Sequence, residues 1–215
     1  MRIEELFFWG IIIANVLFSY KGFNDYNFFR KYEFHIGSIL GGERYRMLSS
    51  AFLHADLMHL AFNMITFYFF APTVISYLGI WMFLLIYFGS LFLGNFLTLA
   101  LHKNDYNYRA VGASGAVTGI IYSAILFEPE RELGLYFLID IPAYLFGIGY
   151  LLYSIYGMKA QNDNIGHTAH FGGAIGGYLL TLILVPQLLW IHTKMVILLA
   201  IPIVILFYLM KTKRL

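Results

Sequence analysis

Long apolar segments separated by polar loops make up most of the chain, and this pattern predicts seven membrane-spanning helices. From Leu57 to Leu101 no Asp, Glu, Lys or Arg occurs. A helix of that length would extend roughly 68 Å, about twice the hydrocarbon core of a bilayer. The segment must therefore cross twice, and Pro72 and Gly79 mark the expected turn between its halves. The expected spans are residues 6–20, 57–71, 80–101, 114–127, 141–156, 168–185 and 191–210.

The first apolar segment, residues 6–20, is expected to remain in the protein as a span. A signal peptide carries a basic leader and a small-x-small cleavage site, and this segment has neither. A long polar loop follows it and extends to the start of the second span at Leu57.

Composition supports a membrane protein. Hydrophobic residues make up 60% of the 215 positions and charged residues only 12%, whereas about 25% of a soluble domain is charged. The pattern predicts an all-α membrane protein, one compact helical bundle without an appended soluble domain. The absence of cysteine excludes disulfides, thiolate nucleophiles and cysteine-rich metal sites. The net charge of +2 gives no reason to expect a nucleic-acid partner.

Polar residues inside such a bundle are costly, so each is a functional candidate. Three clusters stand out. Helical spacing places His59 and Asn63 on one helix face, and it places His170 on one face with Gly173 and Gly177. The clusters are "FLHADLMHLAFNM" with His54, His59 and Asn63; "GASG" with Gly112, Ser114 and Gly115; and "DNIGHTAHFGGAIGG" with His167, His170, Gly173 and Gly177.

Each cluster also has an interpretation without catalysis. A serine in a Gly-rich transmembrane segment usually serves close helix packing, and small residues four apart occur in both glycine-containing clusters. Polar residues such as His59 and Asn63 often form interhelical hydrogen bonds. The histidine pairs could suggest a metal site, but no carboxylate stands at ligand spacing inside the spans, so we expect no metal.

The combination of the three clusters favours nucleophilic catalysis. A serine hydroxyl is a weak nucleophile at neutral pH, and a histidine with a pKa near 6.5 is suited to take its proton. An Asn amide, a second His and the N–H of Ser114 could stabilise the developing oxyanion. If the glycines let helices 114–127 and 168–185 approach closely, Ser114 and His170 come within reach near one membrane face.

At these residues the sequence resembles the rhomboid family of intramembrane serine proteases. The resemblance runs from "ERYRMLSSAFLHADLMHLAFNM" through "GASG" and "IPAYLFGIGYLLYSIYG" to "DNIGHTAHFGGAIGG", in the family's order and spacing. It implies that Ser114, in the GxSG motif, is the nucleophile. It also implies that His170, in the Ala-His-x-x-Gly motif, is the general base and acid.

The same resemblance implies roles for residues around this pair. His59 and Asn63 match the family's oxyanion-hole pair, and His54 matches a structural histidine just before them. Arg46 matches the basic residue of a Trp-Arg motif that holds the first loop by hydrogen bonds, with Tyr45 where the tryptophan would be.

The fold implied is a rhomboid-like six-helix transmembrane bundle around a water-filled cavity, plus one extra C-terminal transmembrane helix. We expect residues 1–190 to form the catalytic core and residues 191–215 the extra helix and basic tail. The implied activity is cleavage of peptide bonds in or next to transmembrane helices of membrane-protein substrates within the lipid bilayer, by a Ser-His dyad without a cofactor. We expect a multi-pass integral protein of the cell membrane.

Thr118 departs from the family pattern. Relatives often have an aromatic residue four positions after the nucleophile, which stacks on the catalytic imidazole. A threonine cannot stack, and its hydroxyl could simply bond its own backbone one turn back. The imidazole of His170 must then be held by other groups or be looser. Asp163 lies in the adjoining loop, but the sequence does not place it within reach.

The distribution of basic residues conflicts with the orientation that the resemblance implies. An N-terminus inside puts only Arg2, Arg131 and Lys194 inside, leaving eleven of the 14 Lys and Arg residues outside. The positive-inside rule prefers the reverse. The family orientation is kept as what the resemblance implies, and the residues themselves predict only that His59, Ser114 and His170 share one face.

Two other classes of function stay open. A catalytically inactive rhomboid-like protein that binds membrane clients would usually lack the serine or the histidine. A transporter or channel would need polar groups along a path that reaches both faces. Labelling by a fluorophosphonate distinguishes these classes from a serine protease.

Overall fold

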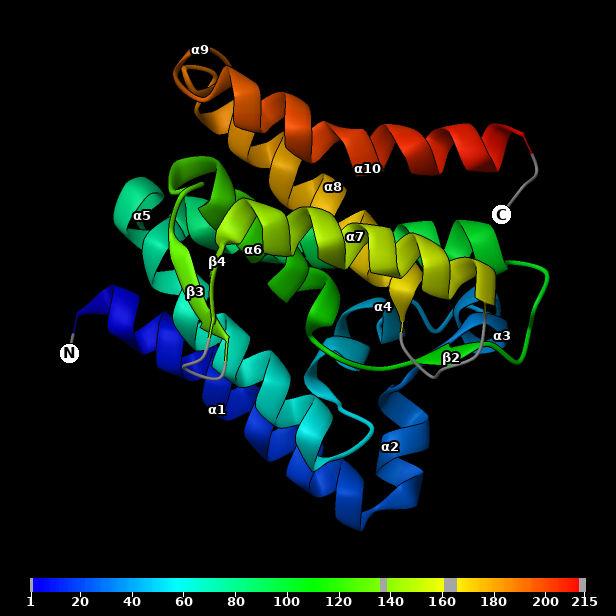
Figure 1. Cartoon of the computed structure of the whole chain (residues 1–215). Coiled ribbons are helices and arrows are strands. Elements are labelled where there is room, and N and C mark those ends of the chain that lie inside the picture. The colour runs from blue at the N-terminus through cyan, green and yellow to red at the C-terminus, as the bar shows by residue number, and fades with distance from the viewer. Residues whose placement is uncertain (1, 136–138, 161–165, 213–215) are drawn as a thin grey trace.

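The computed structural model describes residues 2–135, 139–160 and 166–212, most of which lie in helices (Figure 1). Helices stand at all seven positions where a span is expected, which confirms the helical membrane fold class. Three of them, α1, α5 and α10, are long and apolar enough to cross a membrane, and α6 is apolar but shorter. The long helices are α1 (Ile3–Asn24), α5 (Leu57–His102), α6 (Ser114–Phe127), α7 (Ala143–Ala160), α8 (His167–Leu184) and α10 (Thr193–Lys211).

The sequence predicted an irregular first loop, but this segment contains short helices. Between α1 and α5 the chain forms α2 (Tyr26–Tyr32), α3 (Ile36–Leu40), α4 (Arg46–Ser49) and the 3-10 helix η1 (Ser50–Phe52). One further short helix, α9 (Leu188–Ile191), joins α8 to α10.

The long helix α5 is two helices that meet at Gly79. The backbone of Gly79 has φ +72° and ψ 171°, a conformation that side-chain-bearing residues rarely adopt. The turn predicted between the two halves of this segment therefore lies at Gly79 and not at Pro72. The expected end of the second span at Ala71 is wrong, because Pro72 lies within a helix that continues to the Gly79 turn.

Two short antiparallel ladders were not predicted, because two to four residues are too few to show a period-two pattern. The first pairs β1 (Phe34–His35) with β2 (Arg109–Ala110), so the first loop is joined to the segment just before α6. The second pairs β3 (Glu132–Leu135) with β4 (Ile139–Pro142) between α6 and α7.

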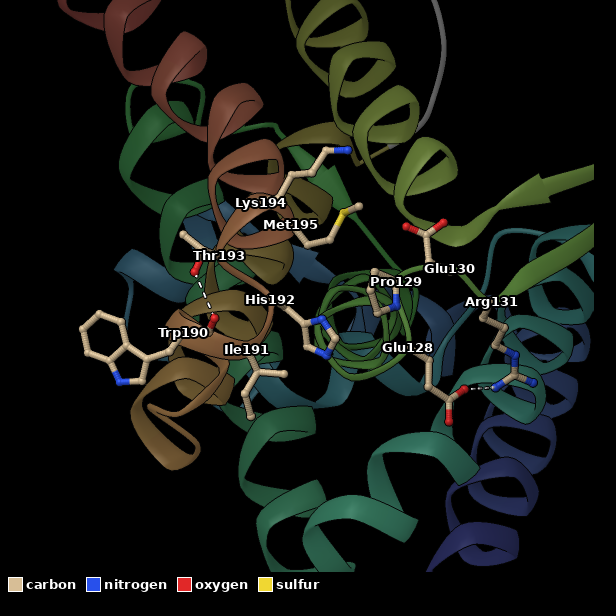
Figure 2. Close-up of a pocket in the computed structure, with 10 residues that line it drawn as sticks. All are labelled: Glu128, Pro129, Glu130, Arg131, Trp190, Ile191, His192, Thr193, Lys194 and Met195. Carbon is tan, nitrogen blue, oxygen red and sulfur yellow. Dashed lines mark hydrogen bonds and ion pairs between the residues drawn. The ribbon is translucent and has the colours of Figure 1, made fainter.

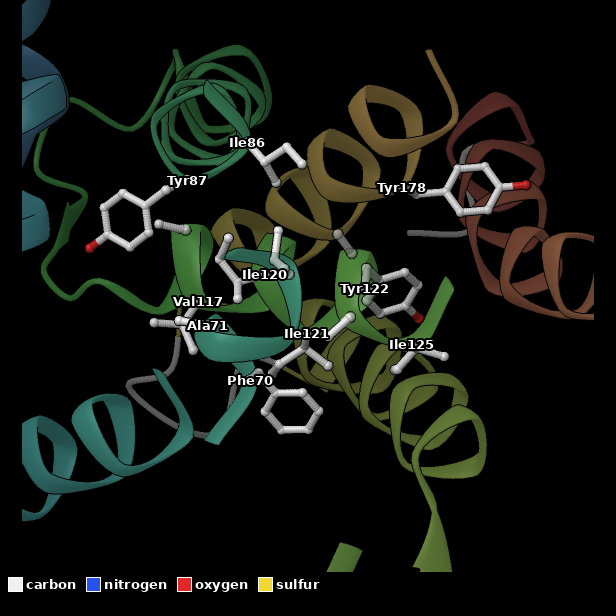
Figure 3. Packing of buried hydrophobic residues seen from close by; sticks show 14 of the residues in the cluster. Phe70, Ala71, Ile86, Tyr87, Val117, Ile120, Ile121, Tyr122, Ile125 and Tyr178 are labelled. Atoms are coloured by element: carbon white, nitrogen blue, oxygen red, sulfur yellow. The ribbon is translucent and has the colours of Figure 1, made fainter. Parts of the chain in front are cut away.

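Helix α6 is the centre of the bundle. Every residue from Gly115 to Phe127 is buried, and α6 packs against both α5 and α8 (Figure 1). Helix α1 packs against α5, and α10 packs against α7. Figure 3 shows the apolar side chains at the centre. Those it labels on α5 and α6 are Phe70, Ala71, Ile86, Tyr87, Val117, Ile120, Ile121, Tyr122 and Ile125.

The contact between α6 and α8 depends on glycine, as the sequence spacing predicts. A Cβ added at Gly173 would overlap the carbonyl oxygen of Gly115, and one at Gly177 would overlap the carbonyl oxygen of Gly119. The two backbones touch directly, which maximises the dispersion contacts that hold helices together in lipid.

Helix α5 joins this contact through small residues that the sequence analysis did not single out. A Cβ at Gly176 would lie 2.8 Å from the Cα of Ser90, and one at Gly172 would lie 2.7 Å from the Cα of Gly94. Ser90 and Gly94 are four residues apart, the same small-residue spacing, so the signal was present in the sequence.

One pocket lies at the C-terminal end of α6 (Figure 2). Its volume is about 760 Å³. None of its lining residues belongs to the three polar clusters, because Ser114 stands at the opposite end of the same helix. The lining residues are Glu128, Pro129, Glu130, Arg131, Trp190, Ile191, His192, Thr193, Lys194 and Met195.

Candidate active site

Ser114 is the first residue of α6, directly after a turn that requires glycine. Gly112 has φ +124°, and its N–H donates to the Ser50 carbonyl at 3.0 Å. A Cβ at Gly112 would lie 2.8 Å from the His59 Nε2 and 3.6 Å from the Ser114 Oγ. The His59 ring and the Ser114 hydroxyl therefore border the same point, and Gly112 leaves that point open.

His54, which is fully buried shortly before α5, holds this turn in place. Its Nε2 lies 3.4 Å from the Ala113 backbone N–H, which is a donor, so the imidazole accepts there. The Nδ1 then carries the proton and donates to the Ser19 Oγ at 2.9 Å, and the Ser19 hydroxyl donates to the Phe52 carbonyl at 3.0 Å. These roles are mutually consistent, because each of the three hydrogen bonds has one donor hydrogen and one acceptor.

The protonation state of His54 agrees with this arrangement. Burial, with a smaller contribution from the neighbouring His59, lowers the pKa of His54 from 6.5 to about 3. At neutral pH the imidazole is therefore uncharged, and it can accept a hydrogen bond from Ala113.

His59 and Asn63 lie one turn apart at the start of α5, as their spacing predicts. Asp56 caps the helix by accepting the His59 N–H at 2.8 Å. The Ala55 N–H donates to the His59 Nδ1 at 3.5 Å, so the proton of a neutral ring is on Nε2, the nitrogen that faces Gly112. Asn63 is buried and donates from Nδ2 to the His59 carbonyl at 2.9 Å, which uses one of its two amide hydrogens.

His170 is buried on α8 and contacts Tyr150 of α7. The two rings are stacked with centroids 5.4 Å apart and planes inclined by 27°. The Tyr150 hydroxyl lies 2.8 Å from the His170 Nδ1. Sequence reasoning missed Tyr150. No spacing in the sequence distinguishes it from the other three tyrosines of α7.

The crossing of α6 and α8 brings the segments around Ser114 and His170 together. A Cβ at Gly115, the residue after Ser114, would lie 3.2 Å from the carbonyl oxygen of Ala169, the residue before His170. The first turns of both helices therefore lie side by side at one end of the bundle.

Thr118 behaves as its simpler interpretation predicts, since its hydroxyl donates to the Ser114 carbonyl at 2.7 Å, one turn back. The alternative of a loosely held His170 is wrong. Its imidazole is stacked and hydrogen-bonded after all, by a ring from a different helix.

His167 is a neighbour of this cluster. Its ring centroid lies 6.1 Å from that of His170 and 5.3 Å from that of Tyr153. A Cβ at Gly157 would overlap the His167 ring, so α7 approaches α8 closely here. Asp163 lies outside the described residues. Within the part of the chain that is described, no group of three or more His, Asp or Glu side chains could hold a metal ion.

Arg46 organises the first loop. The side chain is buried, and its Nη1 donates to the carbonyls of Arg30 at 2.8 Å and Glu33 at 3.0 Å. Its Nε donates to Glu43 at 2.5 Å, and this hydrogen bond holds the pKa of Glu43 below its usual value. Tyr45 is more exposed, and its hydroxyl donates to the Lys31 carbonyl at 3.2 Å.

Comparisons with known proteins identify the family of the chain. A family model of the Rhomboid domain matches residues 41–187. The chain is 29% identical to RHOMBOID-like protein 12, mitochondrial, of Arabidopsis thaliana over 77% of its length, and 35% identical to the rhomboid protein YdcA of Bacillus subtilis over 69%. It is 31% identical over 61% of its length to the presenilin-associated rhomboid-like protein, mitochondrial, of Rattus norvegicus.

The matched region spans 71% of the Bacillus protein but only 54% of the Arabidopsis protein and 36% of the rat protein. The domain match covers well over half of the chain and includes all three polar clusters. The chain is a multi-pass integral membrane protein and belongs to the rhomboid family.

Proposed function

We propose that this protein is an intramembrane serine endopeptidase that cleaves peptide bonds in or next to the transmembrane helices of membrane-protein substrates. The observation that carries the proposal is the meeting of the α6 and α8 first turns at Gly115 and Ala169, next to Ser114 and His170, with the His59 ring bordering the same turn. Family membership supports proteolysis as the class of reaction.

In the proposed reaction the Ser114 Oγ attacks the carbonyl carbon of the scissile bond. The Nε2 of His170 takes the hydroxyl proton and returns it to the leaving amine, which departs as the new N-terminus. Water then attacks the acyl-enzyme with His170 as base, which releases the carboxylate product and restores the Ser114 hydroxyl. No cofactor takes part in these steps.

The oxyanion of the tetrahedral intermediate needs donors that are already in position. The proposed donors are the His59 Nε2–H, the second amide hydrogen of Asn63 and the N–H of Ser114. The Ser114 N–H is in the first turn of α6, where backbone N–H groups have no intrahelical acceptor and the helix dipole favours negative charge.

Substrate access sets a limit on which bonds are cut. A peptide inside lipid keeps its backbone hydrogen bonds by staying helical, so a scissile segment must be extended at the membrane edge. We propose that substrates carry helix-breaking residues near that edge.

The proposed domain division is a catalytic core of residues 1–190 with residues 191–215 added to it. The Rhomboid domain match ends at residue 187, and α10 follows and packs against α7. For location and orientation, we propose the cell membrane with the N-terminus inside. The Arabidopsis and rat relatives are named as mitochondrial, so membrane fractionation is the direct test of location.

Orientation is testable because the chain contains no cysteine. A single cysteine placed at the exposed Lys31 should react with a membrane-impermeant maleimide in intact cells. Reaction only after the membrane is permeabilised would reverse the proposed orientation.

The test of the activity is labelling of the purified protein by a fluorophosphonate, together with cleavage of a transmembrane reporter. Wild type should be labelled at Ser114 and should cut the reporter, and Ser114→Ala and His170→Ala should do neither while keeping their melting temperatures. Because the two residues act as one unit, the double variant should be little worse than either single variant. A folded wild type that is neither labelled nor active would support a client-binding scaffold instead.

A further inference from the structure

Tyr150 on α7 and Thr118 on α6 are neighbours beside the proposed catalytic histidine. The Tyr150 hydroxyl is 2.8 Å from the His170 Nδ1, and the Thr118 side chain is its neighbour. The Thr118 hydroxyl lies 2.7 Å from the Ser114 carbonyl oxygen. These contacts connect the imidazole to the backbone of the proposed nucleophile through two side chains from different helices.

We propose that Tyr150 and Thr118 are positioning residues, which together fix the tautomer and the ring plane of His170 for proton transfer from Ser114. The proposal rests on the proposed protease function and deepens it. It assigns to two neutral hydroxyl groups the task that an orienting carboxylate performs in a serine-protease triad.

The donor and acceptor roles in this series of contacts follow from the Ser114 carbonyl oxygen at its end. The Ser114 carbonyl oxygen can only accept, so the Thr118 hydroxyl donates its hydrogen there. The Thr118 oxygen can then accept from the Tyr150 hydroxyl, whose own oxygen is left to accept from His170. In this order the His170 Nδ1 carries the hydrogen, and Nε2 is the nitrogen that takes the Ser114 proton.

The ring of Tyr150 contributes separately from its hydroxyl. Stacking at 5.4 Å with an inclination of 27° restricts rotation of the imidazole about its bond to Cβ. The stack and the hydroxyl contact come from one side chain, so the plane of the imidazole and the position of its hydrogen are set together.

The identity of residue 118 allows this arrangement. Thr118 is almost completely buried, at 1% exposure, and its short side chain leaves the ring of Tyr150 the place next to His170. A bulkier side chain at 118 would compete with that ring. The small Thr118 on α6 and the aromatic Tyr150 on α7 are therefore sterically compatible with each other at this position.

Four variants in purified protein separate positioning from folding. Tyr150→Phe keeps the ring and removes the hydroxyl, and we expect kcat for a transmembrane reporter to fall about 10- to 100-fold with KM little changed. Thr118→Val removes the second hydroxyl at nearly constant volume and should lower kcat by a smaller factor. Thr118→Ser should restore kcat to near the wild-type value. The double variant of Tyr150→Phe and Thr118→Val should be no slower than Tyr150→Phe alone.

Matched controls exist for both hydroxyl groups. Tyr122 is buried on α6 and donates to the Gly147 carbonyl at 2.8 Å, and Thr98 on α5 bonds the Gly94 carbonyl one turn back at 2.9 Å. Tyr122→Phe and Thr98→Val should lower the melting temperature by amounts comparable to those of the test variants and leave kcat unchanged.

The outcomes are distinct. Wild-type kcat in Tyr150→Phe, or an equal loss in Tyr122→Phe, would overturn the positioning role while leaving the protease function intact. Should Tyr150→Phe fail to fold, the Thr118 pair decides: unchanged kcat in Thr118→Val, or no rescue by Thr118→Ser, overturns the proposal. A wild type without cleavage or fluorophosphonate labelling would instead overturn the proposed function and this inference with it.

Discussion

Gly173 on α8 lies directly against the carbonyl oxygen of Gly115 on α6, with no room for a Cβ between them. This contact is one residue from Ser114 and three from His170, so it controls how far apart the two proposed catalytic residues can be. Packing at this crossing is therefore tied to the proposed catalysis as well as to stability.

The first prediction concerns this glycine. Gly173→Ala should force the two helices apart, lower stability by about 1–3 kcal/mol as overpacked contacts do, and reduce cleavage more than stability alone explains. Thermal unfolding in detergent and reporter cleavage measure the two effects. The control is Gly149→Ala on α7, where a Cβ meets nothing within 4 Å. Equal behaviour of the two variants would contradict the prediction.

Asn63 gives the second prediction. Asn63→Ala should lower kcat by about 10- to 1,000-fold, the range for loss of one oxyanion donor, with a smaller change in KM. The matched control is Asn15→Ala, because Asn15 is also buried and also donates one turn back, to the Ile11 carbonyl at 2.8 Å on α1. If Asn63→Ala cleaves normally but melts much earlier, Asn63 contributes to stability only.

The third prediction is a pH dependence of stability that originates in His54. Its pKa is lowered from 6.5 when unfolded to about 3 when folded, so the unfolded state binds the extra proton between these values. The stabilisation is complete above pH 6.5 and is lost progressively as the pH falls toward 3. By linkage, the free energy of unfolding should be about 2 kcal/mol lower at pH 5 than at pH 7 on account of this residue.

Comparison with His54→Gln isolates this contribution from that of the other histidines. The glutamine side chain does not titrate, so the variant should show a flatter dependence of unfolding free energy on pH in mixed micelles. The same slope in both proteins would mean that His54 is protonated in the folded state and that the hydrogen-bond directions given for it are wrong.

Arg46 supplies the fourth prediction. Arg46→Lys keeps the charge but replaces a planar fork by a single ammonium, which cannot reach Glu43 and both carbonyls at once. We expect a loss of about 1–3 kcal/mol and faster proteolysis within the first loop. Arg44→Lys, at an exposed neighbouring position, should show neither change.

The fifth prediction concerns Thr118→Phe. A larger ring at this buried position has to displace Tyr150 from its stack on His170, because both side chains contact the same region. Stability should fall by about 1–3 kcal/mol, and fluorophosphonate labelling should slow. Faster labelling by a stable variant would show that a ring from α6 can replace the one from α7.

The features that sequence predicted correctly are those that depend on local spacing. Glycines four residues apart lie on one face of a helix whatever the helix packs against, so the contact of α6 with α8 could be predicted from Gly115, Gly119, Gly173 and Gly177. The same argument placed His59 and Asn63 together.

The features that were missed depend on how helices cross. Tyr150 is one of many tyrosines in an apolar helix, and its contact with His170 follows from the angle between α7 and α8, which no spacing encodes. Likewise, Pro72 was a plausible breaker, but proline within a transmembrane helix is tolerated when neighbours satisfy the freed groups. Only the left-handed backbone at Gly79 turned the chain.

The ladder between β1 and β2 joins the first loop rigidly to the segment that precedes α6. Phe34 is paired with Ala110, and two further ties, from Gly112 to Ser50 and from Ala113 to His54, follow within three residues. A displacement of the first loop is therefore passed to the backbone just before Ser114, whose N–H is a proposed oxyanion donor. Substitutions that break the β1–β2 pairing should therefore lower kcat at a smaller disturbance than the one needed to raise KM.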